Sequence, residues 1–387
     1  MITIAIDIRL IGQNRTGDEA VFRNLTREVL TADTVNRYLL LTDKADSEST
    51  DRILTLLGKD GRLPENAEIV VLRARNRYEW NFFSVPLFLS KRSVDVFHTQ
   101  YILPSFVPRR TKVVTHIHDI SFRMFPEYIG VADRLFLSFF IPHTMRRSEM
   151  IVVPSAFTRD EIISSYGVSK DRITVIHNAV DPSFLVEPTT EMLALAQSRN
   201  GLPESFILSV GTMQPRKNIP TLIGAFAKIR KEFPNLKLVL VGGHGGRHYD
   251  TAIDDAIKSE DGLEDSIVFP GYVQQEDMPA LYRLASILAF PSRYEGFGIP
   301  LLEAFAAGTP VVASDIPPFR EVGGEAVTYF DPMDVSACAD SLRMLLVDKT
   351  AARKAGTAGK IRLESFDWGA SAGMMISCYM SVSDRTD

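Results

Sequence analysis

Cysteine, long apolar runs and excess basic charge are all scarce in this chain, and each scarcity excludes a class of protein. Only two cysteines occur, Cys338 and Cys378, and their spacing fits no metal site or redox motif. So few thiols favour a reducing compartment, and the cytoplasm is the first expectation. No apolar run approaches the roughly 20 residues that a membrane-spanning helix needs, and the first residues lack the basic region and cleavage site of a secretion signal.

The charge balance excludes a further class. The formal net charge is −5 and the pI is about 5.9, which argues against a nucleic-acid-binding protein that works through bulk charge. Hydrophobic residues make up 45% and charged residues 24% of the 387 residues. This composition and length suit a globular protein of two or three domains.

Short apolar runs alternate with helical patterns along the chain. Such alternation predicts an α/β protein with parallel sheets and helices on both faces. Ligands of such sheets lie beyond the carboxyl ends of the strands, so the residues after each run are the ones to inspect. The expected strands lie at 2–6, 38–41, 69–72, 94–97, 113–117, 151–153 and 173–176, and then at 206–211, 236–243, 267–273, 286–290, 310–314 and 326–329.

The loop that follows the run at 286–290 is the most informative stretch. Pro300 suits the first turn of a helix and Gly308 its C-terminal end. Gly296 and Gly298 allow the main chain to approach a ligand, and the helix N-terminus offers amide groups and a positive dipole end. We therefore expect an anionic ligand at this loop.

Two glutamates, Glu295 and Glu303, flank this anion site. Carboxylates beside an anion are useful when they accept hydrogen bonds from hydroxyl groups. The combination predicts a ligand in which a sugar is attached to a phosphate. The pair alone is equally compatible with one glutamate that caps a turn and another that decorates a helix, so partners elsewhere decide between the two interpretations.

A second anion site is expected after the run at 206–211. Arg216 and Lys217 precede a helix that begins near Ile219, and Asn218 is the candidate N-cap residue. A diphosphate would interact there with a guanidinium, an ammonium and a helix dipole together. The alternative is a solvated basic loop.

Polar residues also follow the expected strands of the first half. His98 follows one run and His118-Asp119 another, where His118 could donate to a sugar hydroxyl or phosphate oxygen and Asp119 could orient it or hold the loop. A polar loop at 12–17 precedes a helix that we expect to begin at Val21. Its acidic residues, Asp18 and Glu19, either receive hydroxyls of an acceptor or simply favour the helix dipole.

The string Pro-Ser-Arg-Tyr-Glu-Gly-Phe-Gly-Ile-Pro at 291–300, with seven residues between Glu295 and Glu303, resembles the E-x7-E signature of retaining glycosyltransferases of family four. The resemblance extends over essentially the whole chain. It implies the GT-B fold, an α/β architecture with two Rossmann-like parallel-sheet domains facing across a crevice. Residues 1–180 would bind the acceptor, residues 181–365 the nucleotide sugar, and residues 366–387 would form a helix that crosses back to the first domain.

The resemblance also implies a role for individual residues. One departure from the family pattern is Glu19, which stands where a second glycine is usual and whose charge would repel a phosphate. The implied roles are catalysis by His118, Asp119 and Glu295; donor diphosphate binding by Arg216, Lys217 and Gly17; donor sugar binding by Glu295, Gly296, Phe297 and Gly298; and nucleotide binding by Gly211, Tyr272, Val273, Leu302 and Glu303.

The implied reaction is the transfer of a hexose from a nucleotide-diphosphate sugar to a hydroxyl of a glycan or polyprenyl-linked acceptor, in surface polysaccharide or glycolipid synthesis. GDP-mannose is the favoured donor, because the strings at 210–218 and 294–300 are most similar to bacterial mannosyltransferases of the family. A UDP-hexose donor and a nucleotide-sugar 2-epimerase are the alternatives. The joint presence of the site residues disfavours an inactive, lectin-like subunit. The oligomeric state is left open.

No two aspartates are two positions apart, so the chain has no Asp-x-Asp motif of the kind that holds a metal in many glycosyltransferases. We therefore expect neither a metal nor a cofactor.

Two segments, 73–92 and 134–147, mix basic and apolar residues. Either could dock on the inner, anionic face of the cell membrane, as family members with lipid-linked acceptors often do. The other interpretation is that both are core-facing helices with solvated basic edges.

Overall fold

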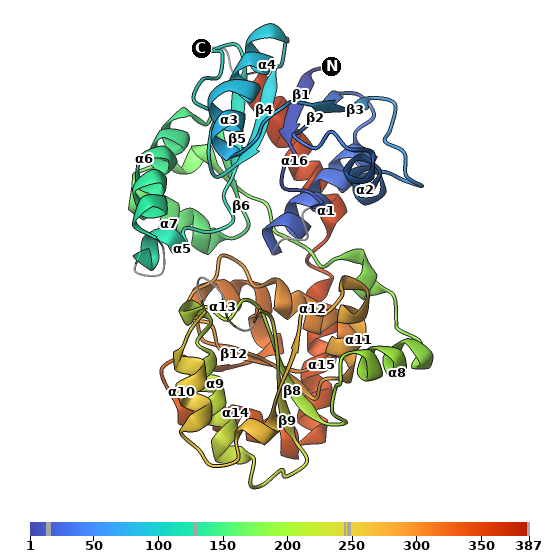
Figure 1. Ribbon diagram of the computed structural model, residues 1–387, viewed down its shortest axis with the longest axis vertical. Helices are drawn as coiled ribbons and strands as arrows, with labels where there is room; N and C mark the ends of the chain where they lie inside the picture. Colours follow the sequence, from blue (N-terminus) through green and yellow to red (C-terminus); the bar gives the residue numbers. More distant parts are fainter. Residues whose placement is uncertain (13–16, 127–129, 244, 246–248, 385–387) are drawn as a thin grey trace. The chain divides into compact units, whose positions relative to one another are not determined.

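The computed structural model describes residues 1–12, 17–126, 130–243, 245 and 249–384, and it leaves out the side chains of residues 131–133. The chain forms two compact units (Figure 1). Unit 1 comprises Met1–Met124, Gly130–Ala179 and Asp367–Asp387, and unit 2 comprises Phe125–Ile129 and Val180–Phe366.

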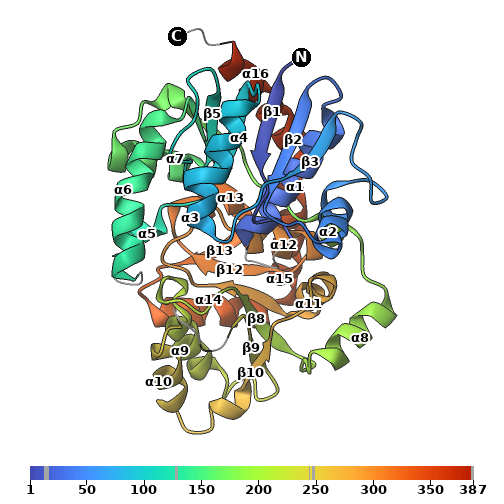
Figure 2. The same ribbon diagram turned by 45° about the horizontal axis from the view of Figure 1, so that its top comes forward.

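Unit 1 is built on a seven-stranded sheet in the order β3-β2-β1-β4-β5-β6-β7, and all of its strand pairs are parallel. The first three strands run side by side in Figure 2. The strands are β1 Thr3–Asp7, β2 Arg37–Thr42, β3 Ala67–Val71, β4 Val96–Gln100, β5 Lys112–His116, β6 Met150–Val153 and β7 Ile173–Val175.

Separate apolar clusters form the core of unit 1, one around Trp80 and Phe97 and another around Ile141 and Ile151. The helices are α1 Gly17–Ala32, α2 Ser47–Leu57, α3 Arg77–Glu79, the π-helical turn η1 Trp80–Ser84, α4 Val85–Lys91, α5 Ser121–Met124, α6 Val131–Arg147, α7 Ala156–Tyr166 and α16 Trp368–Ser383. Ser155 caps α7 by accepting the Thr158 amide at 3.0 Å, which satisfies one of the free amides of the first helical turn.

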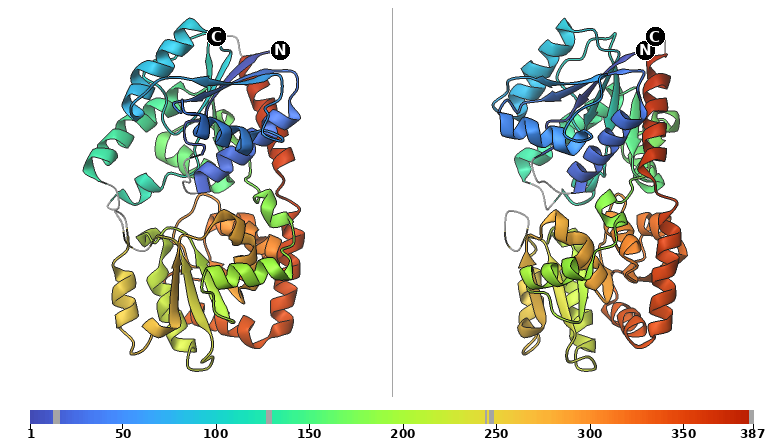
Figure 3. Two further views of the ribbon diagram at one scale, coloured as in Figure 1. Left: turned by 45° about the vertical axis from the view of Figure 1, so that its right-hand side comes forward. Right: turned by 90° about the vertical axis from the view of Figure 1, so that its right-hand side faces the viewer.

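The last helix, α16, belongs to unit 1 although the whole of unit 2 precedes it in the chain. It packs against α1, β4 and β5 and lies along this unit in Figure 3. The hydroxyl of Ser371 donates to the carbonyl of His177 at 2.7 Å, and the hydroxyl of Tyr379 bonds to Nδ1 of His98 at 2.7 Å. The C-terminal segment is therefore an integral part of the core of unit 1.

Unit 2 contains a six-stranded parallel sheet in the order β10-β9-β8-β11-β12-β13. Its strands are β8 Phe206–Val210, β9 Lys237–Val241, β10 Ile267–Gly271, β11 Ile287–Phe290, β12 Val311–Ser314 and β13 Val327–Phe330. Its helices are α8 Thr190–Arg199, α9 Ile219–Ile229, α10 Ala252–Lys258, α11 Met278–Leu284, α12 Ile299–Ala307, α13 Pro317–Gly323, α14 Val335–Val347 and α15 Lys349–Leu363.

Helix α12 ends where the sequence predicted. Gly308 follows its last residue with a φ of 71°, a left-handed conformation that glycine adopts without strain. Short 3₁₀ turns complete the unit and include η4 Pro182–Leu185 and η5 Pro215–Lys217. Among the described helices of either unit, none combines the length and apolar character needed to cross a membrane.

In each sheet there is one strand from which the strands that follow it in the chain are added first on one side and then on the other. In unit 1, β1 lies between β2 and β4, and in unit 2, β8 lies between β9 and β11. The loops after β8 and β11 therefore leave the sheet on opposite faces and open a space between them, where ligands of open parallel sheets bind. Both anion-binding loops expected in the second half of the chain lie at this point.

Candidate active site

The loop after β8 is held in place by Asn218. Its Nδ2 donates to the carbonyls of Pro291, at 3.0 Å, and Pro332, at 2.8 Å, while its Oδ1 accepts from Thr221 Oγ1 at 2.9 Å and Arg293 Nε at 3.1 Å. Its backbone is left-handed, with a φ of 57°, a conformation that asparagine tolerates better than most residues. Asn218 thus ties this loop to the loops after β11 and β13.

This network corrects one detail of the sequence prediction. Asn218 occupies the N-cap position of α9, but its side chain makes no capping hydrogen bond. The Thr221 amide is instead bonded to the main-chain carbonyl of Asn218 at 3.1 Å. The reason is that the side-chain oxygen of Asn218 already accepts from the Thr221 hydroxyl and from Arg293.

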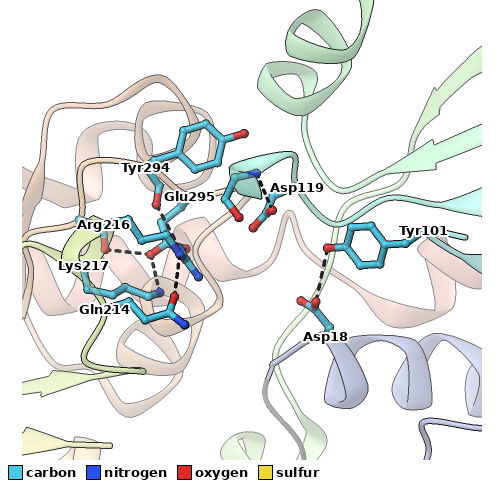
Figure 4. A network of polar contacts seen from close by, with 10 residues as sticks. Asp18, Tyr101, Asp119, Gln214, Arg216, Lys217, Tyr294 and Glu295 are labelled. Atoms are coloured by element: carbon cyan, nitrogen blue, oxygen red, sulfur yellow. Dashed lines mark hydrogen bonds and ion pairs between the residues drawn. The ribbon is translucent and has the colours of Figure 1, made fainter. Parts of the chain in front are cut away.

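The cationic residues that precede Asn218 form an ion triad with Glu295, which follows β11 (Figure 4). Arg216 Nη1 lies 3.0 Å from Glu295 Oε2, and Lys217 Nζ lies 2.5 Å from Glu295 Oε1. The hydroxyl of Ser292 donates to the same Oε1 at 2.8 Å. The sequence predicted these three charged residues at one site, and the fold brings them into direct contact.

Electrostatics keep the Glu295 carboxylate ionised. Burial opposes its charge, but the charges of Lys217 and Arg216 and the hydrogen bonds from Lys217 and Ser292 outweigh burial and lower its pKa to about 2. The carboxylate also balances two cations that would otherwise repel each other in a largely buried place. The triad is therefore a charged arrangement held together by side chains of unit 2.

Further contacts orient the guanidinium of Arg216. Its Nε donates to Gln214 Oε1 and its Nη1 to the carbonyl of Tyr294, both at 3.3 Å (Figure 4). The amide of Arg293 donates in turn to the carbonyl of Arg216 at 2.8 Å. The loops after β8 and β11 are thus joined through both main chain and side chains.

A small pocket opens beside the triad, at the carboxyl ends of β8, β9 and β11. Gly211, Lys217, Phe290 and Ser292 are among its lining residues. Gly211 has a φ of 148°, and a Cβ there would lie 3.5 Å from Lys217 Cε. That distance is an ordinary van der Waals contact, so the backbone conformation, and not a lack of space, favours glycine here.

The loop from Glu295 to α12 is buried throughout. Gly298 has a φ of 117°, and a Cβ at this position would meet the ring of Phe319 at 3.0 Å, so both backbone and space require glycine. Phe297 packs its ring edge-on against Phe366, with centroids 5.8 Å apart. The predicted sugar-binding residues, including Gly296, thus form a rigid entry into α12, whose N-terminus carries a partial positive charge.

Helix α12 carries both Leu302 and Glu303. Leu302 is fully buried, so its side chain belongs to the core and any contact with a nucleotide would come from its main chain. The Glu303 carboxylate accepts a hydrogen bond from the hydroxyl of Tyr282 on α11. Burial raises the pKa of Glu303 to about 7, the hydrogen bond from Tyr282 opposes this rise, and the charge of Asp181 adds to it.

The remaining predicted nucleotide-binding residues follow β10. Tyr272 is 68% exposed and Val273 is buried. Gly271, the last residue of β10, is left-handed with a φ of 76°. An exposed ring at the carboxyl end of a strand is suitably placed to contact a planar ligand.

The predicted catalytic pair of unit 1 lies just after β5. His118 is buried, with Nε2 2.9 Å from Gln100 Oε1. Asp119 accepts the Ser121 amide at 2.9 Å, so it holds the start of α5. Of the two roles considered for Asp119, its hydrogen bond with the Ser121 amide matches loop-holding.

The other two histidines near this point, His98 and His116, are core residues. His116 stacks on His118 with ring centroids 4.4 Å apart and on His98 at 6.1 Å. Burial, with a smaller effect of His118, lowers the pKa of His98 to about 3 and that of His116 well below its ordinary value. Both rings are therefore neutral near pH 7 and support His118 by packing.

Helix α1 begins at Gly17, earlier than the expected start at Val21. Its first turn contains Asp18 and the buried Glu19, and Glu19 accepts the Gly12 amide at 2.7 Å. Asp18 accepts from the hydroxyl of Tyr101 at 3.4 Å (Figure 4). Both carboxylates thus sit at the positive end of the helix dipole, as one of the two interpretations expected.

Three contacting residues were missed by sequence reasoning as parts of the site: Ser292, Tyr282 and the tethering side chain of Asn218. Ser292 lies inside the Pro-Ser-Arg-Tyr-Glu string, so its position three residues before Glu295 was the available signal. Tyr282 gave no such signal, because its contact depends on how α11 packs on α12. Among the described residues, no group of three or more His, Cys, Asp or Glu side chains is placed to hold a metal ion.

Comparison with known proteins gives consistent matches in both units. The sequence profile described as "Glycosyltransferase Family 4" matches residues 21–184, and that described as "Glycosyl transferases group 1" matches residues 195–362. O-antigen chain mannosyltransferase B of Escherichia coli is 30% identical over 275 residues, which are 71% of this chain and 72% of that protein.

Solved structures resemble this chain over nearly its full length. Sucrose-phosphate synthase from Thermosynechococcus elongatus matches with a TM-score of 0.75 and 22% identity, over 99% of both chains. Anabaena HepE, solved in complex with UDP-glucose, matches with a TM-score of 0.74 and 18% identity, over 98% of this chain and 100% of that one. These likenesses, with one parallel sheet in each unit, confirm the predicted GT-B fold.

The two profiles cover both units, and the Escherichia coli relative shares enough sequence to establish kinship. The segment with Glu295 and Glu303, which first indicated this family, lies within the residues matched by the profile "Glycosyl transferases group 1". This chain therefore belongs to the family 4 glycosyltransferases and is a glycosyltransferase of the GT-B fold.

Proposed function

We propose that this glycosyltransferase moves a mannosyl group from GDP-mannose to a hydroxyl of a glycan or polyprenyl-linked acceptor, with retention of the anomeric configuration. The observation that carries the proposal is the ion triad of Arg216, Lys217 and Glu295 at the point where β8 and β11 meet. Two cations and a carboxylate at one place suit a ligand with both a diphosphate and hydroxyl groups.

In this proposal unit 2 binds the donor. Arg216 and Lys217 contact the diphosphate, helped by the N-terminus of α12. Glu295 accepts hydrogen bonds from sugar hydroxyls together with the loop at 296–298, and Glu303 accepts from the ribose. Tyr272 and Val273 frame the base, and His118 contacts the transferred sugar from unit 1.

The reaction breaks the bond between C1 of the sugar and the diphosphate oxygen and forms a bond from C1 to the acceptor oxygen. The acceptor attacks on the face that the diphosphate leaves, and its proton passes to the departing diphosphate. Arg216 and Lys217 stabilise the negative charge that develops on the leaving group. A hydrogen bond to a charged group contributes roughly 1.5–3 kcal/mol, so several of them lower the barrier substantially.

We propose that these cations make a metal ion unnecessary. The enzyme should keep full activity after treatment with a chelator, because the leaving diphosphate is neutralised by side chains. The measurement is the initial transfer rate with and without EDTA, and with added manganese. A rate that is lost on chelation and restored by manganese would overturn this part of the proposal.

The identity of the donor rests on kinship. The Escherichia coli relative is an O-antigen mannosyltransferase, which favours mannose and a role in surface polysaccharide synthesis. The structurally similar HepE was solved with UDP-glucose, which makes a UDP-hexose the second candidate. Mannose and glucose share their hydroxyls at positions three and four, so Glu295 alone does not separate them.

A competition experiment separates the two donors. Calorimetry should show that GDP binds the enzyme and that it displaces GDP-mannose, whereas UDP competes weakly. The matching activity assay uses GDP-mannose and UDP-glucose with one acceptor. If UDP displaces the bound donor and GDP does not, a UDP-hexose replaces GDP-mannose.

We also propose that unit 1 contacts an anionic membrane surface, where a polyprenyl-linked acceptor would be found. Segment 73–92 has five basic residues and one acidic residue, and segment 134–147 has three basic residues and none acidic, although the whole chain has a net charge of −5. Aromatic contacts join the segments, since Tyr78 packs on Phe136 and Phe82 on Phe140, with centroids 5.9 and 5.8 Å apart.

Each of these segments exposes an apolar ridge. Phe83 and Leu87 are 70% and 56% exposed, and Leu135 and Phe139 are 67% and 71% exposed. Within each pair the residues are four positions apart, so they lie on one helical face. Exposed apolar side chains among basic residues are typical of a surface that binds at the membrane interface.

A further inference from the structure

The hydroxyl of Tyr282 is the only hydrogen-bond partner found for the Glu303 carboxylate among the residues that the structure describes. It donates to Oε2, and among the described residues no hydrogen bond is formed by Oε1. Tyr282 itself is fully buried, so its hydroxyl has no access to solvent. A buried phenol in this position either makes this bond or loses hydrogen bonding altogether.

The packing of α11 on α12 fixes the phenol ring. The main-chain carbonyl of Tyr282 accepts from Thr309 Oγ1 at 2.7 Å, and Arg283 Nη1 donates to the carbonyl of Ala307 at 2.7 Å. The edge of Phe184, in η4, packs against the ring with centroids 5.5 Å apart. These contacts thus fix the position of the Tyr282 hydroxyl beside Glu303.

We propose that Tyr282 is a positioning residue for nucleotide binding: it holds one carboxylate oxygen of Glu303 so that the other accepts a hydrogen bond from a ligand hydroxyl. The inference rests on the proposed function, in which Glu303 binds the ribose of the donor. A carboxylate held at one oxygen loses less conformational freedom when a ribose binds, which strengthens the contact.

Electrostatics give Tyr282 a second effect on the same carboxylate. Burial raises the pKa of Glu303 and the hydrogen bond from Tyr282 opposes that rise, so the bond favours the ionised form near neutral pH. Asp181, before η4, acts in the opposite direction. Of the charged residues on α11 and α15, Arg283 pairs with Glu187, and the exposed Lys360 lies near Gly308 at the far end of α12.

The direction of the pH effect follows from these contacts. Ribose hydroxyls donate to a carboxylate, so binding is strongest above the pKa of Glu303, which is about 7, and weakens as the pH falls through it. Removal of the Tyr282 hydroxyl raises that pKa further. The acid side of the binding profile should then move to higher pH.

The test is calorimetric binding of GDP and UDP to the full-length protein between pH 5.5 and pH 9. Tyr282→Phe keeps the ring and its packing. We expect this variant to bind the nucleotides about tenfold more weakly at pH 7 and to lose less affinity at pH 9. We also expect the loss of affinity on acidification to begin at a higher pH than in wild type. Tyr38→Phe is a matched control, because Tyr38 is a buried tyrosine in unit 1 whose hydroxyl donates to Asp33 at 2.6 Å.

Three outcomes are distinguishable. If wild type binds neither GDP nor UDP, the proposed function fails. If wild type binds and Tyr282→Phe has the same affinity and pH profile, the positioning role is wrong while the function stands. If Tyr282→Phe does not fold, Glu303→Asp replaces it, since a shorter side chain withdraws the carboxylate from the hydroxyl. An unchanged pH profile in that variant also overturns the role.

Discussion

At the scale of single residues, the site is organised by a carboxylate that holds two cations. Glu295 bonds to Arg216 and Lys217 and is itself bonded by Ser292. Its pKa of about 2 lies below its ordinary value, so its stabilising effect is complete above pH 4.5 and is lost as the pH falls toward 2. Binding of a diphosphate must therefore compete with a carboxylate that stays ionised at every physiological pH.

We expect Lys217→Ala to weaken nucleoside diphosphate binding about tenfold or more, because it removes a charge-assisted hydrogen bond. Arg216→Ala should have a smaller effect, since the guanidinium also donates to Gln214 and to the carbonyl of Tyr294. Calorimetry measures the affinity and circular dichroism the fold. Lys228→Ala, which removes an exposed cation of α9, is the control. Unchanged affinity in both site variants would show that the phosphate assignment is wrong.

Glu295→Gln should separate binding from transfer. The variant keeps the shape of the side chain but removes its charge, so more of the positive charge of Arg216 and Lys217 acts on the diphosphate. We expect nucleoside diphosphate affinity to stay equal or rise, while the transfer rate falls. A parallel loss of affinity and rate would mean that the carboxylate mainly maintains the structure of the site.

At the scale of elements, Asn218 connects three loops of unit 2. The left-handed backbone and the four side-chain hydrogen bonds of this one residue fix where α9 begins. The loop that carries both cations thus takes its position from the ends of β11 and β13.

Asn218→Ala should lower the free energy of unfolding by about 2–4 kcal/mol, because it loses these hydrogen bonds and strains the backbone. Asn218→Gly loses the same bonds without the backbone strain, so it should be less destabilised, by about 1 kcal/mol. Urea denaturation measures both. Equal stabilities of the two variants would show that backbone strain contributes nothing here.

The sequence predicts contiguous parts of this site well and distant contacts poorly. The sites around Arg216 and Glu295 could be predicted from the sequence, because in each segment a strand pattern, a glycine and the start of a helix follow one another along the chain. The Asn218 contact with Pro332 spans 114 positions and depends on strand order, which periodicity does not give. The same limit explains the missed tether of Glu303 to Tyr282, which spans 21 positions. The early start of α1 is a local miss, since Glu19 in its first turn is bonded back to the Gly12 amide only seven positions away.

At the scale of the whole molecule, the two units carry different surfaces. The exposed apolar ridges and basic segments of the proposed membrane contact lie in unit 1, and the ion triad lies in unit 2. Membrane contact and donor binding are therefore separable by mutation.

The double variant Phe83→Ser and Phe139→Ser should reduce co-sedimentation with anionic phospholipid vesicles several-fold, because it removes the most exposed apolar side chains of both ridges. Leu185→Ser and Val347→Ser, which change similarly exposed residues of unit 2, provide the control. Binding of wild type should weaken in high salt. Equal binding of all variants, or none by wild type, would contradict the proposed surface.

Helix α16 has a consequence for how the protein is made. Unit 1 takes part of its core from residues that leave the ribosome only after all of Val180–Phe366 has been synthesised. At about 5–20 residues per second, the nascent first sheet waits roughly ten to forty seconds for its last helix. During that interval the sites that will receive Ser371 and Tyr379 are uncovered, so unit 2, all of whose residues precede α16 in the chain, can finish folding before the unit that begins the chain.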